Sequence, residues 1–220
     1  MIVLTPNPRY RFTTRDGSPS DEAVIRETWV ENVYQIHAGD LAREGAVCVD
    51  IGANIGAVAV YAASLGGVRV LAAEPEPDNL KYLRQNIDDN GVAEKVHICE
   101  AAVSGHRGVG YIVEGHGHSV LHPDPQPNSV EVPVLTLADL FDQYEIGECD
   151  VLKVDIEGAE YPLMAGADLD TLRRVRYLTL EFDAAPDELF GPLVAKLAKT
   201  HGIQILGSPE RGGYIYARRY

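Results

Sequence analysis

Short apolar runs recur along the chain from about residue 46 onward, and segments with a helical pattern separate them. Most of the runs are too apolar to alternate with polar positions, as expected for strands covered on both faces of a sheet. Strands that alternate with helices in this way predict a parallel sheet wrapped by helices. The predicted strands are Ala46–Asp50, Val68–Ala73, Val96–Cys99, Val151–Val154 and Arg176–Leu180.

Two of the intervening segments have the spacing of amphipathic helices. Pro77–Asn90 begins with a proline, which suits the first turn of a helix, and its leucine and isoleucine residues recur on one face. Residues 186–201 place Leu189, Leu193 and Leu197 at intervals of four. We expect both segments to be helices whose apolar faces pack against the sheet.

The two ends of the chain and one internal segment depart from this alternation of strands and helices. Ile203–Leu206 and Tyr214–Ala217 are joined by a connection too short for a helical crossover, which predicts an antiparallel hairpin. Residues 1–40 are less regular, apart from a helical pattern at Asp21–Ile36, and we expect them to form an N-terminal cap on the sheet. Residues 105–135 are rich in glycine, proline and histidine, which predicts an irregular insertion that carries substrate specificity.

Composition and charge narrow the class of protein. With 220 residues, 45% hydrophobic and 24% charged, the chain has the size and balance of one globular domain, residues 1–220. Its 33 acidic and 19 basic residues give a formal charge of −14, which repels nucleic acids and anionic membrane surfaces. The 3 cysteines lie in or beside apolar runs, as reduced core thiols do. We therefore expect a cytoplasmic protein with no nucleic-acid partner.

One uncharged stretch, residues 51–68, has the length of a short membrane-spanning helix. Glycines and Asn54 interrupt it, and strand-like runs flank it, so a buried turn followed by a helix is the better interpretation. The N-terminus also lacks the basic region of a signal peptide. We expect no membrane segment.

A glycine turn, Asp50–Gly56, follows the first predicted strand and opens a helix. Glycine allows a tight turn and lets a ligand approach the main chain, while the start of the helix offers free N–H groups. Asn54 stands where the dinucleotide fingerprint requires its central glycine, and Asp50 suits an ammonium group better than a diphosphate. This pattern favours a zwitterionic amino acid with a nucleoside attached.

The second predicted strand ends at Glu74, one βα unit of roughly 20 residues beyond Gly52. A carboxylate at this position can accept hydrogen bonds from both hydroxyls of a ribose. Its register with the glycine turn favours this role over that of a solvated turn residue. We therefore expect Glu74 to bind the ribose.

Four motifs occur along the chain in this order: Val49–Gly56, Glu74–Leu80 with Leu83 and Asn86, Ala101–Ser104, and Leu152–Glu160. Together they resemble the FkbM family of S-adenosylmethionine-dependent methyltransferases. The resemblance implies an α/β fold, the Rossmann-like class I methyltransferase fold. It has a mostly parallel sheet of seven strands with an antiparallel C-terminal hairpin and helices on both faces. It also implies O-methylation of a hydroxyl on a small natural product, a sugar or a glycan, with S-adenosylhomocysteine as the product.

The same resemblance assigns residues to the cofactor. Asp50, Gly52, Asn54 and Gly56 would hold its methionine end and Glu74 its ribose, while Glu100 and Ala101 would border the adenine. Ala101 can do so through its main-chain N–H, so its side chain need not look functional.

Candidate catalytic residues follow the fourth and fifth predicted strands, where ligands of open α/β sheets bind. Asp155, Glu157 and Glu181 could converge there beside the transferable methyl group, and Asp155 could also contact the cofactor. Methyl transfer needs an aligned acceptor oxygen that loses a proton, so we expect Asp155 as base and Glu181 as orienting group. The alternative is that Asp155 and Glu157 cap a helix beginning near Ala159.

Histidines in the insertion offer a second base or a metal site. His116 and His118 could share one face of a strand, but no third fixed ligand accompanies them. We therefore expect His118 to act as a base or acceptor contact and catalysis to be metal-independent.

Two other functions remain open from the sequence. An NAD-dependent dehydrogenase would share the glycine turn and the ribose carboxylate, although the central glycine of its fingerprint is missing. A non-catalytic nucleoside-binding module would have no need for the carboxylates that follow the fourth and fifth strands. Methylation of nucleic acid is opposed by the charge and by the absence of an Asp/Asn-Pro-Pro-Tyr/Phe motif.

Overall fold

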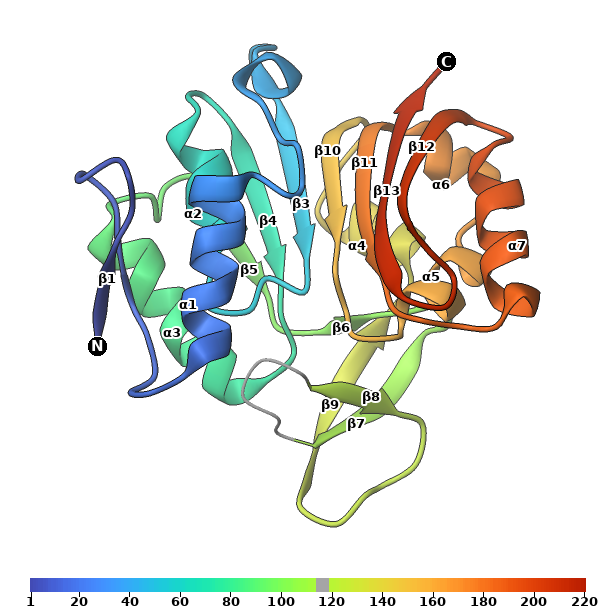
Figure 1. Ribbon diagram of the computed structural model, residues 1–220, viewed down its shortest axis with the longest axis horizontal. Coiled ribbons are helices and arrows are strands. Elements are labelled where there is room, and N and C mark those ends of the chain that lie inside the picture. The colour runs from blue at the N-terminus through green and yellow to red at the C-terminus, as the bar shows by residue number, and fades with distance from the viewer. Residues whose placement is uncertain (114–118) are drawn as a thin grey trace.

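The computed structural model describes residues 1–113 and 119–220, and within them seven strands form the main sheet in the order β12-β13-β11-β10-β3-β4-β5 (Figure 1). Neighbouring strands from β5 to β11 are parallel, whereas β13 runs antiparallel to both β11 and β12. The predicted mostly parallel sheet with an antiparallel C-terminal hairpin is confirmed. The strands are β3 (Val47–Ile51), β4 (Arg69–Ala73), β5 (Val96–Cys99), β10 (Cys149–Val154), β11 (Val175–Phe182), β12 (His201–Ser208) and β13 (Gly212–Arg219).

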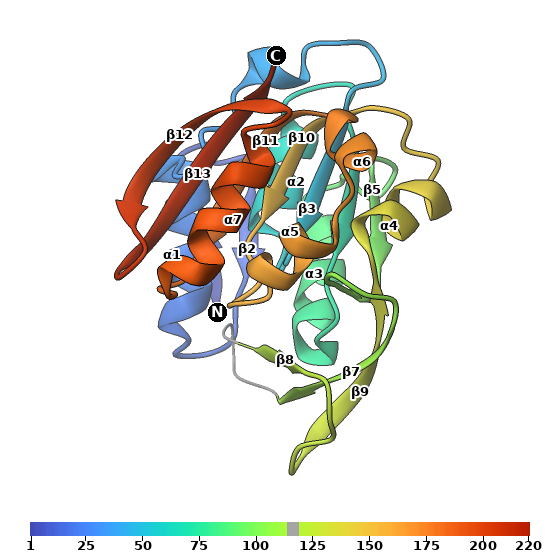
Figure 2. The same ribbon diagram turned by 90° about the vertical axis from the view of Figure 1, so that its right-hand side faces the viewer.

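Helices cover both faces of this sheet because successive side chains of each strand point to opposite faces. One face packs against α1 (Pro19–Arg26), α2 (Ala57–Ser64) and α3 (Pro77–Asp89). The other face packs against α4 (Leu137–Gln143), α5 (Glu160–Gly166), α6 (Leu169–Arg173) and α7 (Asp187–Leu197) (Figure 2). The two faces therefore carry separate apolar cores.

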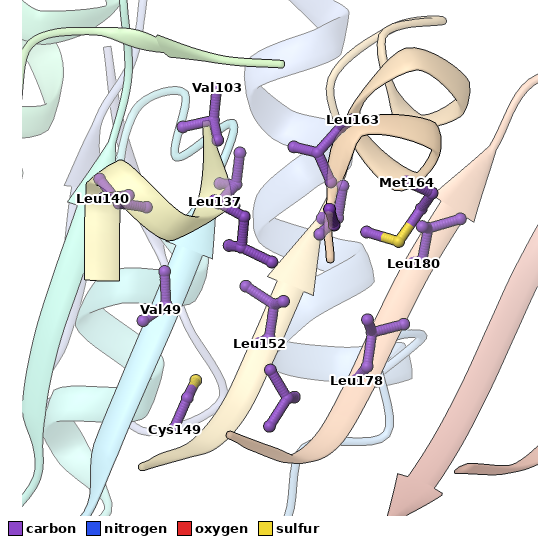
Figure 3. Close-up of a cluster of buried hydrophobic side chains, with 14 of the residues drawn as sticks. Val49, Val103, Leu137, Leu140, Cys149, Leu152, Leu163, Met164, Leu178 and Leu180 are labelled. Carbon is purple, nitrogen blue, oxygen red and sulfur yellow. The ribbon is translucent and has the colours of Figure 1, made fainter. Parts of the chain in front are cut away.

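The core beneath α4 to α7 is built from alternate residues of the central strands. Val49, Leu152 and Leu178 are fully buried there, together with Leu140 and Leu163 from the helices (Figure 3). Burying such a side chain contributes about 1.5–3 kcal/mol each. Because both faces of the strands are buried, the apolar runs in the sequence do not alternate.

The predicted helix at residues 186–201 is shorter than expected. Helix α7 ends at Leu197, and His201 already begins β12. Leu193 and Leu197 are buried as predicted, but Leu189 is 50% exposed, so its assignment to the buried face is wrong. The spacing of Leu189 correctly predicts a helix, but its burial depends on which part of the fold packs against that turn of the helix.

The N-terminal region contains more structure than the sequence indicated. Strands β1 (Ile2–Leu4) and β2 (Arg11–Thr13) pair antiparallel, a feature that such short runs did not reveal. Helix α1 ends at Arg26 and continues as a π-helical turn, η1 (Glu27–Glu31), so the predicted helix at Asp21–Ile36 is only partly correct. A 3-10 turn, η2 (Ala38–Leu41), precedes the main sheet.

The segment predicted as an irregular insertion is ordered into strands in its described part. Strands β7 (Gly108–Val113), β8 (Val120–His122) and β9 (Ser129–Leu135) form a second sheet with β6 (Ala102–Val103). At least one of the glycines that suggested a loop has a packing cause, because a Cβ on Gly110 would lie 2.5 Å from the Leu121 Cδ1 atom. The prediction of irregular structure is wrong here.

No helix in the described residues is long and apolar enough to cross a membrane. The uncharged stretch at residues 51–68 spans the end of β3, the glycine turn and α2. It is a turn and a buried helix, as predicted.

Candidate active site

A cavity opens at the carboxyl ends of the parallel strands, between the main sheet, α1 and the second sheet. Strand β3 contributes Gly52 from its following turn, β4 contributes Glu74, and β10 and β11 contribute Asp155 and Glu181. The segment after β5 adds Ala101. The structure therefore brings together residues from across the predicted site.

The glycine turn takes backbone conformations that few residues adopt. Gly52, Asn54 and Gly56 have φ of +78°, +50° and +92°. A Cβ on Gly52 would lie 1.8 Å from the Asp155 carbonyl oxygen, and one on Gly56 would lie 2.8 Å from the Leu83 Cδ1 atom. These glycines are thus required first by close packing against the neighbouring strand and α3, and Gly56 is not among the residues lining the cavity.

Asn54 explains how the turn forms without the central glycine of a dinucleotide site. Asparagine tolerates the left-handed region better than most residues. Its backbone N–H donates to the Glu74 Oε2 atom at 2.8 Å, and Asn54 is among the residues that line the cavity. The Asn54 Oδ1 atom is buried and has no hydrogen-bond partner among the residues that the structure describes. A buried acceptor without a partner is suited to a ligand that carries a donor.

Glu74 lines the cavity and is only 4% exposed. Its Oε1 atom accepts from the Glu76 backbone N–H at 2.9 Å and from the Asn79 Nδ2 atom at 3.2 Å. Burial raises the pKa of Glu74 to about 7, although these donors and Asn54 oppose the rise. A carboxylate has about four lone-pair sites, so this one retains capacity to accept from a ligand.

Asp50 lies behind the glycine turn rather than in the cavity. It is fully buried, and its Oδ1 atom lies 3.1 Å from the Lys153 Nζ atom on β10. Burial raises the pKa of Asp50, while Lys153 opposes that rise. Since Asp50 does not line the cavity, the expectation that it contacts the ammonium group of a ligand directly is corrected.

Lys153 connects this buried carboxylate to the site. Its Nζ atom donates to the Gly52 carbonyl oxygen at 2.7 Å and lies 3.5 Å from the Asp155 Oδ2 atom. Burial lowers the pKa of Lys153, but Asp50 and Asp155 more than offset this and raise it overall. The side chain is therefore a cation that ties the glycine turn to the end of β10. A lysine inside an apolar run was the sequence signal for this role, and it was missed.

Carboxylates line the end of the cavity beyond the glycine turn. Asp155, Glu157 and Glu181 come together there as predicted from their strand ends, and Glu27 of η1 joins them from the N-terminal region. Burial, with the nearby Asp155, raises the pKa of Glu181 to about 8. Burial likewise raises the pKa of Glu27. Sequence reasoning missed Glu27 because only the tertiary fold brings η1 to this edge.

Asp155 is held on two sides. The Tyr34 hydroxyl donates to its Oδ2 atom at 2.8 Å, and Lys153 lies behind it. The alternative role of capping α5 is not observed in the described part of the chain. There the N-cap is Ala159, and no side chain caps the helix. Tyr34 was a further residue that sequence reasoning missed.

Of the remaining residues predicted to bind the cofactor or the acceptor, some line the cavity and others do not. Ala101 is buried and lines the cavity with Ala102. The Glu100 side chain is 60% exposed, pairs with Arg84 at 2.5 Å and does not line the cavity, so its side-chain contact to a ligand is corrected. His118 lies outside the described residues.

The strand order, the antiparallel last pair and a cavity at the carboxyl ends of the parallel strands define the class I methyltransferase fold. Two solved structures agree with this. Precorrin-6y C5,15-methyltransferase from Geobacter metallireducens superposes with a TM-score of 0.54 at 15% identity, covering 95% of this chain and 94% of that one. An rRNA methylase from Streptococcus thermophilus superposes with a TM-score of 0.55 at 11% identity, covering 88% and 96%. At such identities the likeness establishes the fold alone.

Sequence comparison gives the family. The model of the methyltransferase FkbM domain matches residues 50–216, and the chain belongs to that family. It is 26% identical to 31-O-demethyl-FK506 methyltransferase FkbM of Streptomyces tacrolimicus, over 85% of this chain and 83% of that protein. It is 25% identical to methyltransferase sdnD of Sordaria araneosa, over 69% and 72%. The protein is thus a methyltransferase, and its fold implies S-adenosylmethionine as the methyl donor.

Proposed function

We propose that the protein transfers a methyl group from S-adenosylmethionine to a hydroxyl of a small natural product or sugar. The observation that carries this proposal is the placement of Glu74 and the carboxylates Asp155 and Glu181 on one cavity at the ends of β4, β10 and β11. One side of that cavity can bind a nucleoside, and the other can orient and deprotonate an acceptor.

The residues of the cavity fit the proposed cofactor. The buried Asn54 Oδ1 atom, without a partner in the described residues, can accept from the ammonium group of its methionine part. Glu74 can accept from the ribose hydroxyls, and Ala101 and Ala102 border an apolar space for the adenine. The turn residues Gly52 and Asn54 would hold the methionine part, and Asp50 would act behind them through Lys153.

Glu181 is the base that the geometry favours. When bound, the cofactor supplies a methyl group activated by a sulfonium, and the protein must align the acceptor oxygen and remove its proton. With its pKa raised to about 8, ionised Glu181 is a stronger base than an ordinary carboxylate, and the fraction that can accept a proton grows as pH increases through about 8. Asp155 accepts a hydrogen bond from Tyr34 and lies 3.5 Å from the Lys153 Nζ atom, contacts that fix its position and suit it for orienting the acceptor. In this proposal, Asp155 and Glu181 exchange the roles expected from the sequence.

The acceptor would enter between α1 and the second sheet. Ile112 and Leu121 of that sheet line the cavity, and a second cavity beside it shares Leu121, Glu157 and Ala159. The name of the Streptomyces relative indicates a 31-O-demethyl substrate, which supports a hydroxyl as the methyl acceptor. The formal charge of −14 supports a small molecule over RNA.

The cofactor assignment is tested by titrating S-adenosylhomocysteine into Glu74→Ala and Glu100→Ala by calorimetry. Loss of the ribose bonds should weaken binding by about 1.5–3 kcal/mol, roughly ten- to a hundredfold, in Glu74→Ala. Glu100→Ala is the matched control, because its side chain points away from the cavity, and it should bind as the wild type does. Equal binding by both variants, or tighter binding of NAD by the wild type, would contradict the assignment.

The reaction is tested by supplying S-adenosylmethionine labelled in its methyl group together with a panel of hydroxylated macrocycles, polyketides and sugars. Label should appear on an oxygen of the acceptor, and Glu181→Gln should lose most of the rate at neutral pH because it cannot take the proton. Label found on nitrogen or carbon would contradict O-methylation while leaving the methyltransferase class intact.

A further inference from the structure

The N-terminal segment is fastened to α3 by asparagine side chains. The Asn86 Oδ1 atom accepts from the Thr13 backbone N–H at 2.7 Å, and its Nδ2 atom donates to the Thr13 carbonyl oxygen at 3.1 Å. Asn90 makes the same pair of bonds with Arg11, at 2.9 and 2.7 Å. Two amides one helical turn apart thus bind alternate residues of β2, as a neighbouring strand would. This fixes the backbone that leads to Arg15.

Arg15 then reaches into the first turn of α3. Only 7% of this residue is exposed, and its guanidinium binds Asp21 through the Nε and Nη2 atoms, at 3.2 and 2.5 Å. Its Nη1 atom donates to the Asn79 Oδ1 atom at 2.8 Å and to the Asp78 Oδ2 atom at 3.2 Å. Asp21 is itself fully buried and also accepts from the Arg15 backbone N–H at 2.8 Å. The guanidinium therefore has one fixed position.

The contact with Arg15 determines which way the Asn79 amide faces. A guanidinium has donors and no acceptor, so the Asn79 oxygen must point toward Arg15 and its nitrogen away from it. The Asn79 Nδ2 atom then donates to the Glu74 Oε1 atom at 3.2 Å. Asn79 is itself only 4% exposed, so water has little access to its amide and does not replace Arg15 as its partner. The orientation is transmitted from Arg15 to Glu74 through a single side chain.

We propose that Arg15 is a positioning residue for the cofactor, acting through Asn79 to hold the Glu74 carboxylate in the orientation that accepts from the ribose. The proposal rests on the ribose-binding role of Glu74 given above. It extends the cofactor site to a residue outside the segment 50–216 that the family model matches. The N-terminal region thereby becomes part of the binding machinery rather than only a cover for the sheet.

The donors on Glu74 also govern its protonation. Burial raises the pKa of Glu74 to about 7, Glu76 raises it further, and Asn79 and the backbone N–H groups of Asn54 and Glu76 lower it. Losing the aligned Asn79 donor should therefore raise the pKa of Glu74 and shift the acid limit of cofactor binding to higher pH. On the side of Asn79 that faces away from Glu74 lie the charged side chains of Arg15 and its partners Asp21 and Asp78. The net charge of this group changes only when Arg15 is replaced.

The test compares Arg15→Met with Arg11→Met. Both replace an arginine of the same segment, but Arg11 is exposed and holds α3 through its backbone, so its variant is the matched control. Calorimetry with S-adenosylhomocysteine, from pH 6 to 9 and well below each variant's melting temperature, should show about three- to tenfold weaker binding for Arg15→Met at pH 7.5. The pH below which affinity falls should also rise, and Arg11→Met should match the wild type in both respects.

A second variant covers the case in which Arg15→Met does not fold. Asn79→Asp keeps an acceptor for Arg15 but replaces the donor to Glu74 with a like charge, so it should also weaken binding and raise the pH limit. Normal affinity in Asn79→Asp would show that Glu74 does not need the donor from Asn79 to bind the ribose, which would overturn the proposal.

A double variant separates the two hypotheses. In a Glu74→Gln background, Arg15→Met should produce no further loss of affinity, because both changes act on one interaction. Additive losses would show that Arg15 acts by another route. If Glu74→Gln binds as the wild type does, the ribose assignment itself fails. If Glu74→Gln is weakened while Arg15→Met is not, the assignment stands and only the role of Arg15 fails.

Discussion

Replacing Lys153 with methionine should destabilise the protein strongly, because it leaves a buried carboxylate without its cation. Lys153 is 3% exposed and Asp50 is fully buried, with 3.1 Å between the Nζ and Oδ1 atoms. Methionine can occupy much of the same volume, so the change removes charge and hydrogen bonds more than packing. The Gly52 carbonyl oxygen also loses its donor.

The expected magnitude follows from the burial. Removing one partner of a buried ion pair typically costs about 3–5 kcal/mol, whereas neutralising both partners can cost little. Native domains are stable by only about 5–15 kcal/mol, so the single change would consume a large part of the total. Lys153→Met combined with Asp50→Asn should recover much of the loss. Lys199→Met, at an exposed position of the same residue type, should change stability by less than about 0.5 kcal/mol.

Urea unfolding followed by circular dichroism measures these differences, and pH gives a further check. Burial already raises the pKa of Asp50, and loss of Lys153 should raise it further. At neutral pH Asp50 is ionised in the unfolded chain, but the folded variant disfavours the ionised form, which lowers the free energy of unfolding. This loss of stability should shrink as pH falls toward the unfolded pKa of about 3.9, because Asp50 is then protonated in both states. A deficit below about 1 kcal/mol at pH 7, or a double variant no more stable than the single one, would refute this reasoning.

Three further outcomes are expected. Gly52→Val should lower both the melting temperature and the affinity for S-adenosylhomocysteine, because its Cβ would lie 1.8 Å from the Asp155 carbonyl oxygen; a wild-type melting curve would contradict this. The rate should rise as pH increases through about 8, where Glu181 loses its proton, and Glu181→Gln should flatten that rise; an unchanged pH profile in Glu181→Gln would exclude Glu181 as the base. Methyl transfer should persist in excess EDTA, and a rate lost on chelation and restored by one divalent ion would instead make Asp155 and Glu181 metal ligands.

The sequence by itself determined the sheet and the edge at which the site lies. Runs such as Val151–Val154 are apolar throughout because both faces of a central strand are buried, so their pattern survives in any tertiary context. The residues that follow such runs, Glu74 and Asp155 among them, necessarily meet at the carboxyl edge of a parallel sheet. The cavity lined by Glu74, Asp155 and Glu181 lies at that edge.

Only the tertiary structure decided which of these side chains face the cavity and what holds them. Asp50 meets Lys153 from a strand far along the chain, Glu100 points outward, and Glu27 arrives from the N-terminal region. Such outcomes depend on strand register and on which helix covers which turn, and neither is a local property of the chain. The Arg15 contact with Asn79 has the same origin, because it forms only when β2 is docked on α3. Local pattern determines the elements, and long-range packing selects the partners of each polar side chain.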